Sequence, residues 1–196
     1  MIVGNWGIHM SWRGIAGAVL IAMIPGTAIA APGYYYYSPW SATLFAGPVT
    51  YSHFSRTFEG HFQVNGGMAG LMGDVRLFSL GRGFSIAAEG GFTDYGGKFD
   101  YTTAAAEIGF RYDNYPWSFA FYTGPSYATN PPTDRSEDFV GRHLLNAVSS
   151  ELSYALPHSD GWGVALRLYH RSGAWGLYSL DNDEGTMFGI GVRKQF

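Results

Sequence analysis

The sequence contains no cysteine, which excludes disulfide bonds and thiolate metal sites. Only 14% of the residues are charged, and the net charge of −3 leaves no basic surface for nucleic acid. Long apolar runs are also missing, because the longest, residues 14–24, is shorter than the roughly 20 residues of a membrane-spanning helix. Nucleic-acid binding and a helical membrane domain are therefore not expected.

Glycine, tyrosine, phenylalanine and tryptophan are abundant. The chain has 28 Gly, 14 Tyr, 14 Phe and 6 Trp, and 46% of its residues are hydrophobic. Many glycines supply turns, and many aromatic residues suit strands whose ends lie at a membrane interface. The composition predicts an all-β membrane protein of one domain.

The N-terminus has the pattern of a secretory signal peptide. Arg13 precedes the apolar run, Pro25-Gly26 ends it, and Ala28-Ile29-Ala30 places small residues where a signal peptidase reads them. We expect a signal peptide at residues 1–30 and a mature domain at residues 31–196. The alternative is a single membrane anchor, which the short apolar run disfavours.

Alternation with a period of two residues recurs along the mature chain. From Trp162, the residues Val164, Leu166 and Leu168 alternate with small or polar residues that include Arg167. This alternation places large aliphatic side chains on one face of a strand and polar ones on the other. Eight such strands are expected, at residues 40–49, 68–80, 84–92, 102–112, 117–127, 145–156, from 162 to about 172, and 186–196.

The eight strands predict an antiparallel transmembrane β-barrel of the outer-membrane type. The connections run long, short, medium, short, long, short and long, which puts the short turns on the periplasmic side. A barrel of eight strands has room only for its own side chains, so a pore is not expected. A lipocalin-type barrel would have the opposite parity. Eight strand charges share the face opposite the aliphatic side chains and are expected to pair inside: Asp74, Arg76, Glu89, Glu107, Arg111, Glu151, Arg167 and Arg193.

A histidine and a serine follow the aliphatic face of the seventh strand to its end. His170 and Ser172 are two residues apart, so they project in one direction, roughly 6–7 Å from each other. A serine hydroxyl becomes a good nucleophile when a histidine accepts its proton and an acid orients the imidazole. Glu184 is the candidate acid, because the last hairpin returns it beside His170.

At these residues the sequence resembles the lipid A 3-O-deacylase (PagL-type) family of acyl-ester hydrolases. The resemblance rests on His170-Arg171-Ser172 and Glu184, followed by one last strand. It implies a Gram-negative outer-membrane esterase that acts on the lipid A of lipopolysaccharide in the outer leaflet. Ser172 would be the nucleophile, His170 the base and Glu184 its partner, without a cofactor or metal.

One departure from the family pattern concerns the residue after the serine. The family has an asparagine near the oxyanion there, whereas this chain has Gly173. Loss of one oxyanion donor costs about 10²–10³ in rate. The backbone N–H groups of Gly173 or Gly176 are candidate substitutes, and Trp175 is a candidate for the acyl groove.

Two other functions remain open from the sequence. One is a non-enzymatic barrel for adhesion or envelope stability, in which His170 and Ser172 are interfacial polar residues. The other is an outer-membrane phospholipase that uses the same residues. His53-Phe54-Ser55 and His158-Ser159-Asp160 repeat part of the motif without the strand-end placement. His61 and His143 lack partners at metal-ligand spacing.

Overall fold

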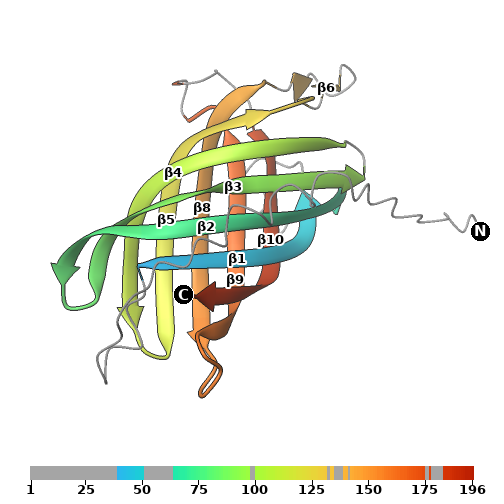
Figure 1. The fold of residues 1–196 in the computed structure, drawn as a ribbon. Coiled ribbons are helices and arrows are strands. Elements are labelled where there is room, and N and C mark those ends of the chain that lie inside the picture. Colours follow the sequence, from blue (N-terminus) through green and yellow to red (C-terminus); the bar gives the residue numbers. More distant parts are fainter. Residues whose placement is uncertain are drawn as a thin grey trace, which may run out of the picture.

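Eight long strands close into one antiparallel barrel in the computed structural model (Figure 1). The structure describes residues 39–50, 64–97, 100–131, 133–134, 139–140, 142–174, 177 and 183–196. The order around the barrel is β1-β10-β9-β8-β5-β4-β3-β2. The strands are β1 (Trp40–Thr50), β2 (Gly66–Gly81), β3 (Phe84–Gly97), β4 (Tyr101–Asn114), β5 (Trp117–Ala128), β8 (Leu144–Ala155), β9 (Trp162–Ser172) and β10 (Asp183–Gln195).

The eight predicted strands and the fold class are confirmed, with two differences in the connections. The connection between β3 and β4, predicted to be of medium length, is residues 98–100 alone. Pairing continues this far because Tyr95 and Tyr101 are partners and stack with centroids 4.2 Å apart. The second difference is a hairpin of two-residue strands, β6 (Thr133–Asp134) and β7 (Phe139–Val140), within a segment predicted to be a loop. Within the described ranges, no helix has the length and apolarity to span a membrane.

The two ends of the barrel carry different connections. β1 begins beside the end of β10, since Ser41 pairs with Gln195, and the turns at residues 82–83, 115–116 and 156–161 lie at this same end. We call it the turn end. The first turn is tight: Gly81 and Gly83 have φ values of 85° and 84°, which glycine adopts without steric cost. The opposite end, the loop end, carries the connections at 51–65, 98–100, 129–143 and 173–182.

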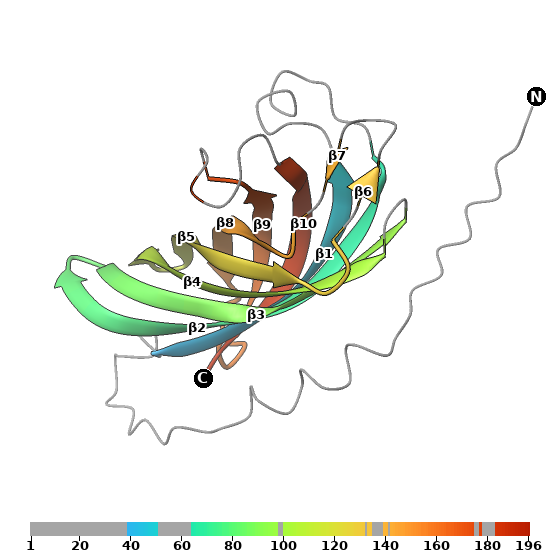
Figure 2. The same ribbon diagram turned by 90° about the horizontal axis from the view of Figure 1, so that it is seen from above.

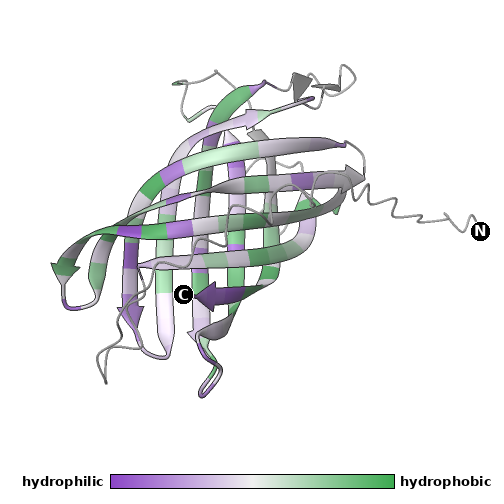
Figure 3. Cartoon of the chain, in the orientation of Figure 1, coloured by the Kyte–Doolittle hydropathy of each residue, from purple (hydrophilic) through white to green (hydrophobic). Residues whose placement is uncertain are grey.

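The outer face of the wall is apolar. Leu166, Ile190 and Leu44 are 58%, 70% and 55% exposed, whereas the alternate side chains of the same strands are buried. Hydrophobic segments recur along the strands from one side of the barrel to the other (Figure 3). An apolar outer belt around a polar interior has the parity of a membrane-spanning barrel and not of a lipocalin.

The lumen contains a continuous chain of ion pairs. Three arginines each contact two carboxylates: Arg111 contacts Asp74 and Asp113, Arg193 contacts Asp74 and Glu151, and Arg167 contacts Glu151 and Glu89. The Arg111–Asp74, Arg193–Asp74 and Arg167–Glu151 distances are 2.9, 2.6 and 3.0 Å. Arg76 joins the chain through Asp113 at 2.7 Å, and Ser149 Oγ lies 3.0 Å from carboxylate oxygens of Glu89 and Glu107.

This network of ion pairs confirms that the eight predicted charges point inward, and it adds Asp113 to them. It ties together strands on opposite sides of the lumen, because Arg167 of β9 reaches Glu89 of β3. Viewed from above, β8, β9 and β10 stand on one side of the barrel and β3 and β2 on the other (Figure 2). Toward the loop end, the side chains that fill the lumen are apolar and aromatic. They include Phe45, Met68, Met72, Tyr169 and Met187. Arg167 lies 4.9 Å from the centre of the Phe45 ring.

The first prediction concerns the lumen. Arg167→Gln should lower the free energy of unfolding by about 3–5 kcal/mol, because Glu89 and Glu151 would keep their buried charges without this partner. Urea unfolding of the barrel in detergent, followed by tryptophan fluorescence, measures the change. Lys194→Gln is the control, since its ion pair with the exposed Asp160 should leave the midpoint unchanged. A midpoint for Arg167→Gln equal to that of the control would contradict the prediction.

The second prediction concerns the outer belt. Ile190→Arg should destabilise the barrel by about 2–4 kcal/mol, because it places a charge against lipid in the middle of β10. Ile190→Val is the matched control and should remain close to the parent chain. Unfolding in liposomes measures both variants, and equal stability of Ile190→Arg and Ile190→Val would reverse the assignment of the outer face.

Candidate functional site

A patch of polar side chains interrupts the apolar outer face at the loop end. His170 and Ser172 lie at the end of β9, on the same face as Leu166 and Leu168. Asn146 of β8 pairs with Ser172, and Thr186 of β10 pairs with His170. Directly opposed residues of antiparallel strands have Cβ atoms about 4.5–5.5 Å apart. Asn146, His170, Ser172 and Thr186 therefore form one cluster, the rim patch.

The rim patch is recessed although its strand positions face outward. His170 is 4% exposed, Thr186 is fully buried and Asn146 is 9% exposed, whereas the outward-facing Leu166 and Ile190 are largely exposed. Ser172 is half-buried. The predicted strand face of His170 and Ser172 is the observed one. The side chain of His170 is nevertheless buried on that face.

The imidazole of His170 makes two polar contacts through Nδ1. Nδ1 lies 3.0 Å from the carbonyl oxygen of Gly185 and 3.1 Å from Thr186 Oγ1. A carbonyl oxygen can only accept a hydrogen bond, so Nδ1 carries the proton and donates it. The other nitrogen, Nε2, then has the lone pair of a base. This is the tautomer that general-base catalysis by histidine requires.

Glu184 belongs to an irregular part of the β9–β10 ladder. Asp183 pairs with Ser172 and Gly185 pairs with Arg171, with a shift of register between them. Such a bulge leaves an extra residue on one strand and redirects its side chain. The backbone of Glu184 therefore lies opposite Arg171 and Ser172 at the end of β9, whereas the residue opposite His170 is Thr186. Its side chain, Trp175 and Gly176 lie outside the described part of the chain, and Gly173 is a buried residue directly after β9.

The sequence predicted no role for four residues of this region, which are Thr186, Asn146, Thr123 and Arg171. Asn146 donates from Nδ2 to Thr123 Oγ1 at 2.9 Å, and both are polar residues on the mostly apolar outward faces of β8 and β5. A polar residue on such a face can be recognised in the sequence. Only the register between β8 and β9 shows that Asn146 lies opposite Ser172. Arg171 lies fully buried between His170 and Ser172 in the chain. It donates to Ser126 Oγ at 2.8 Å and to the His143 carbonyl at 3.3 Å, which ties β9 to β5 and to the start of β8.

The outer wall is hollowed between the rim patch and the turn end. One hollow of about 560 Å³ lies against Leu168, Phe188 and Ser150, and a second of about 960 Å³ lies against Val164, Val192 and Tyr154. The two hollows share Leu166, Leu152, Ile190 and Ala46 as lining residues, so they adjoin. Leu168 precedes His170 by two residues on the same strand face, which places the first hollow directly beside the rim patch.

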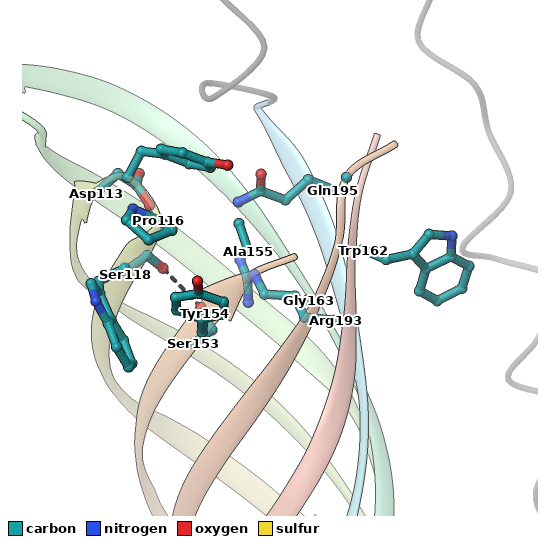
Figure 4. Close-up of a pocket in the computed structure, with 13 residues that line it drawn as sticks. Asp113, Pro116, Ser118, Ser153, Tyr154, Ala155, Trp162, Gly163, Arg193 and Gln195 are labelled. Carbon is teal, nitrogen blue, oxygen red and sulfur yellow. Dashed lines mark hydrogen bonds between the residues drawn. The ribbon is translucent and has the colours of Figure 1, made fainter. Parts of the chain in front are cut away.

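The cavity at the turn end has a different character. It has a volume of about 30 Å³ and is lined by Asp113, Ser118, Ser153, Arg193 and Gln195 among others. Figure 4 shows the hydrogen bond of 3.0 Å between Ser118 and Ser153, and shows Trp162 pointing away from the cavity. This volume has room for about two water molecules. The cavity lies at the mouth of the packed lumen, at the opposite end from His170.

The other histidine and serine motifs do not form a comparable arrangement in the described residues. Ser159 donates within its own turn, to the carbonyl oxygens of Leu156 and Trp162. His143 donates from Nδ1 to the Ala128 carbonyl at 2.8 Å and stacks on Tyr127. His53, Ser55 and His61 lie outside the described ranges. Within those ranges, no cluster of three or more histidine or carboxylate side chains could hold a metal ion.

Comparison with known proteins places the fold among outer-membrane barrels. No protein-family model and no curated protein matches the sequence. Among solved structures, the outer membrane enzyme PagL aligns with a TM-score of 0.56 and 14% identity, over 80% of this chain and 99% of that one. Ail of Yersinia pestis aligns with TM-scores of 0.44 in a phospholipid nanodisc and 0.49 in complex with sucrose octasulfate, at 13% and 12% identity. These two alignments cover 80% of this chain and 99% and 97% of Ail. At such identities the likeness concerns the fold, which is the eight-stranded barrel of the outer-membrane type.

Proposed function

We propose that this protein is an outer-membrane esterase that removes an ester-linked acyl chain from lipid A. The observation that carries the proposal is the state of His170. Its imidazole is recessed on the outer face, its Nδ1–H is bound to the Gly185 carbonyl, and it lies two residues from Ser172 on the same face. A base in the correct tautomer beside a hydroxyl is the minimal unit for acyl transfer.

The reaction follows from these two side chains. Ser172 Oγ attacks the carbonyl carbon of the ester while its proton moves to His170 Nε2, and the C=O electron pair becomes an oxyanion. Collapse of this intermediate breaks the bond to the sugar oxygen, which takes the proton from His170 and leaves an acyl-serine. Water then repeats the sequence: His170 accepts its proton, its oxygen attacks the acyl carbon, and Ser172 leaves with the proton restored.

The surroundings of the rim patch favour a lipid substrate. The patch lies at one end of an apolar belt, where the ester bonds of a lipid are found below its polar head group. The adjoining hollows offer apolar lining to a fatty acyl chain. Short turns at the other end of the barrel favour the periplasm for that end, so the rim patch would face the outer leaflet. A signal peptide at residues 1–30 would direct the chain to this compartment.

Glu184 has a supporting role in this proposal. The Gly185 carbonyl and the Thr186 hydroxyl already bind Nδ1 of His170, and they perform part of the orientation that an acid supplies in other triads. Glu184 adds stabilisation of the imidazolium that forms when the serine proton is transferred.

The third prediction concerns catalysis. Ser172→Ala and His170→Ala should each abolish release of fatty acid from lipid A, and the double variant should lose no more than either one, because both act in a single proton transfer. Glu184→Ala should retain measurable activity. Mass spectrometry of lipid A incubated with the folded protein in detergent measures the deacylation.

The control for these variants is Ser159→Ala, which removes a hydroxyl at the turn end and should leave the activity unchanged. Gly173→Asn introduces the side chain found in the resembling family and should hold or raise the rate. Heat-modifiable gel mobility establishes that each variant is folded. Activity in Ser172→Ala equal to that of the parent chain would exclude the serine mechanism. Release of fatty acid from glycerophospholipid and not from lipid A would identify a phospholipase. An unchanged profile of both lipids with the parent chain would favour the non-enzymatic barrel.

The fourth prediction concerns orientation. A cysteine in place of Leu177, which is 78% exposed in the β9–β10 connection, should react with a membrane-impermeant maleimide on intact cells. A cysteine in place of His158, which is exposed in the turn at residues 156–161, should react only after the outer membrane is permeabilised. Labelling of the His158→Cys variant alone on intact cells would place the rim patch at the periplasmic leaflet.

A further inference from the structure

We infer that Asn146 supplies a side-chain hydrogen bond to the oxyanion formed at Ser172, which makes it a catalytic residue. This inference rests on the proposed ester hydrolysis and adds a member that the His-x-Ser motif does not contain. The chain lacks an amide side chain directly after its serine, where Gly173 stands. In the structure, the amide side chain nearest to the serine along the ladder is that of Asn146 on the neighbouring strand β8.

The register between β8 and β9 places Asn146 beside the serine. Asn146 and Ser172 are Cα partners in the ladder, and the next outward pair is Val148 with His170. Both members of a directly opposed pair project to the same face, with Cβ atoms about 4.5–5.5 Å apart. An asparagine amide extends far enough from its Cβ to reach an oxygen on a carbon bonded to Ser172 Oγ.

Among the described residues, the amide of Asn146 is held by Thr123 of β5, the strand beside β8 on the side away from β9. Its Nδ2 donates to Thr123 Oγ1 at 2.9 Å, and Thr123 Oγ1 also lies 3.3 Å from Asn146 Oδ1 and 3.1 Å from the Ala147 carbonyl oxygen. The Nδ2 group carries two N–H donors, and Thr123 can accept one of them. The second N–H is then available to an oxygen bound at Ser172.

Burial strengthens this arrangement. Asn146 is 9% exposed on a strand face whose other large residues, such as Leu144 and Leu152, are exposed. A donor that is fixed before the reaction and screened from water stabilises a developing negative charge without reorganising.

The donor acts in two steps of the reaction. When Ser172 Oγ forms its bond to the ester carbon, the electron pair of the C=O bond moves to the oxygen, and the Asn146 Nδ2–H would donate to this oxyanion. The same contact would form again when water attacks the acyl-serine. Asn146 exchanges no proton in either step, so His170 alone carries the proton from nucleophile to leaving group.

Asn146→Asp tests the inference, because aspartate keeps the size of asparagine and can accept a hydrogen bond from Thr123 but presents no N–H donor when ionised. Asn146→Ala removes the whole amide. Both variants should lower kcat for lipid A deacylation by about 10²–10³ and leave KM within about threefold, because the contact is made in the transition state and not with the bound ester. Asn114→Ala, which removes an exposed amide at the turn end of β4, is the matched control and should retain full activity.

The outcomes separate this inference from the proposed function. If the parent chain deacylates lipid A, Ser172→Ala is inactive and both Asn146 variants keep the kcat of Asn114→Ala, the role of Asn146 is excluded while the esterase proposal stands. A rise in KM at unchanged kcat would likewise exclude the oxyanion role. If the parent chain releases no fatty acid, the proposed function falls and this inference falls with it. Heat-modifiable mobility equal to that of the parent chain is required of each variant that is compared.

Discussion

The contacts of Arg167 and Arg193 with their three carboxylates are the interaction on which the barrel depends. Both arginines bind Glu151, Arg167 also binds Glu89, and Arg193 also binds Asp74. These five side chains come from β2, β3, β8, β9 and β10. A buried arginine is tolerated only when carboxylates satisfy its charge and its N–H groups. The register of several strands must therefore be correct together before any one of these pairs can form.

A filled lumen has a consequence for where chemistry can occur. Ion pairs occupy the half of the lumen near the turn end, and aromatic and methionine side chains occupy the half near the loop end. A substrate-sized cavity has no place inside such a barrel. In the described part of the chain, the rim patch gathers polar groups outside the lumen, on the outer face at the loop end. Under the proposed function, a lipid would reach that face from within its own leaflet, without first leaving the membrane.

The strands of the barrel wall also fix the positions of the rim-patch side chains. Three neighbouring strands, β8, β9 and β10, contribute its side chains, and ladder hydrogen bonds hold them at fixed separations. The backbone carbonyl of Gly185 and the hydroxyl of Thr186 define the His170 tautomer, and Thr123 holds the amide of Asn146. Sites built on rigid elements keep the positions of their groups better than sites on loops. The remaining candidate partner, Glu184, comes from the irregular start of β10, where a bulge redirects the chain.

The sequence by itself determined which side chains face the membrane and which face the lumen, because alternation along a strand is a local property with a period of two residues. Leu166 and Arg167 were assigned to opposite faces for that reason, and His170 was placed on the face of Ser172. Only the tertiary structure decided which residues lie beside one another. Arg167 meets Glu89 across the lumen, Asn146 stands opposite Ser172, and Nδ1 of His170 binds the Gly185 carbonyl. These contacts depend on the stagger between strands, which is fixed by turn geometry and by the simultaneous pairing of buried charges around a closed ring. No window of consecutive residues contains that information.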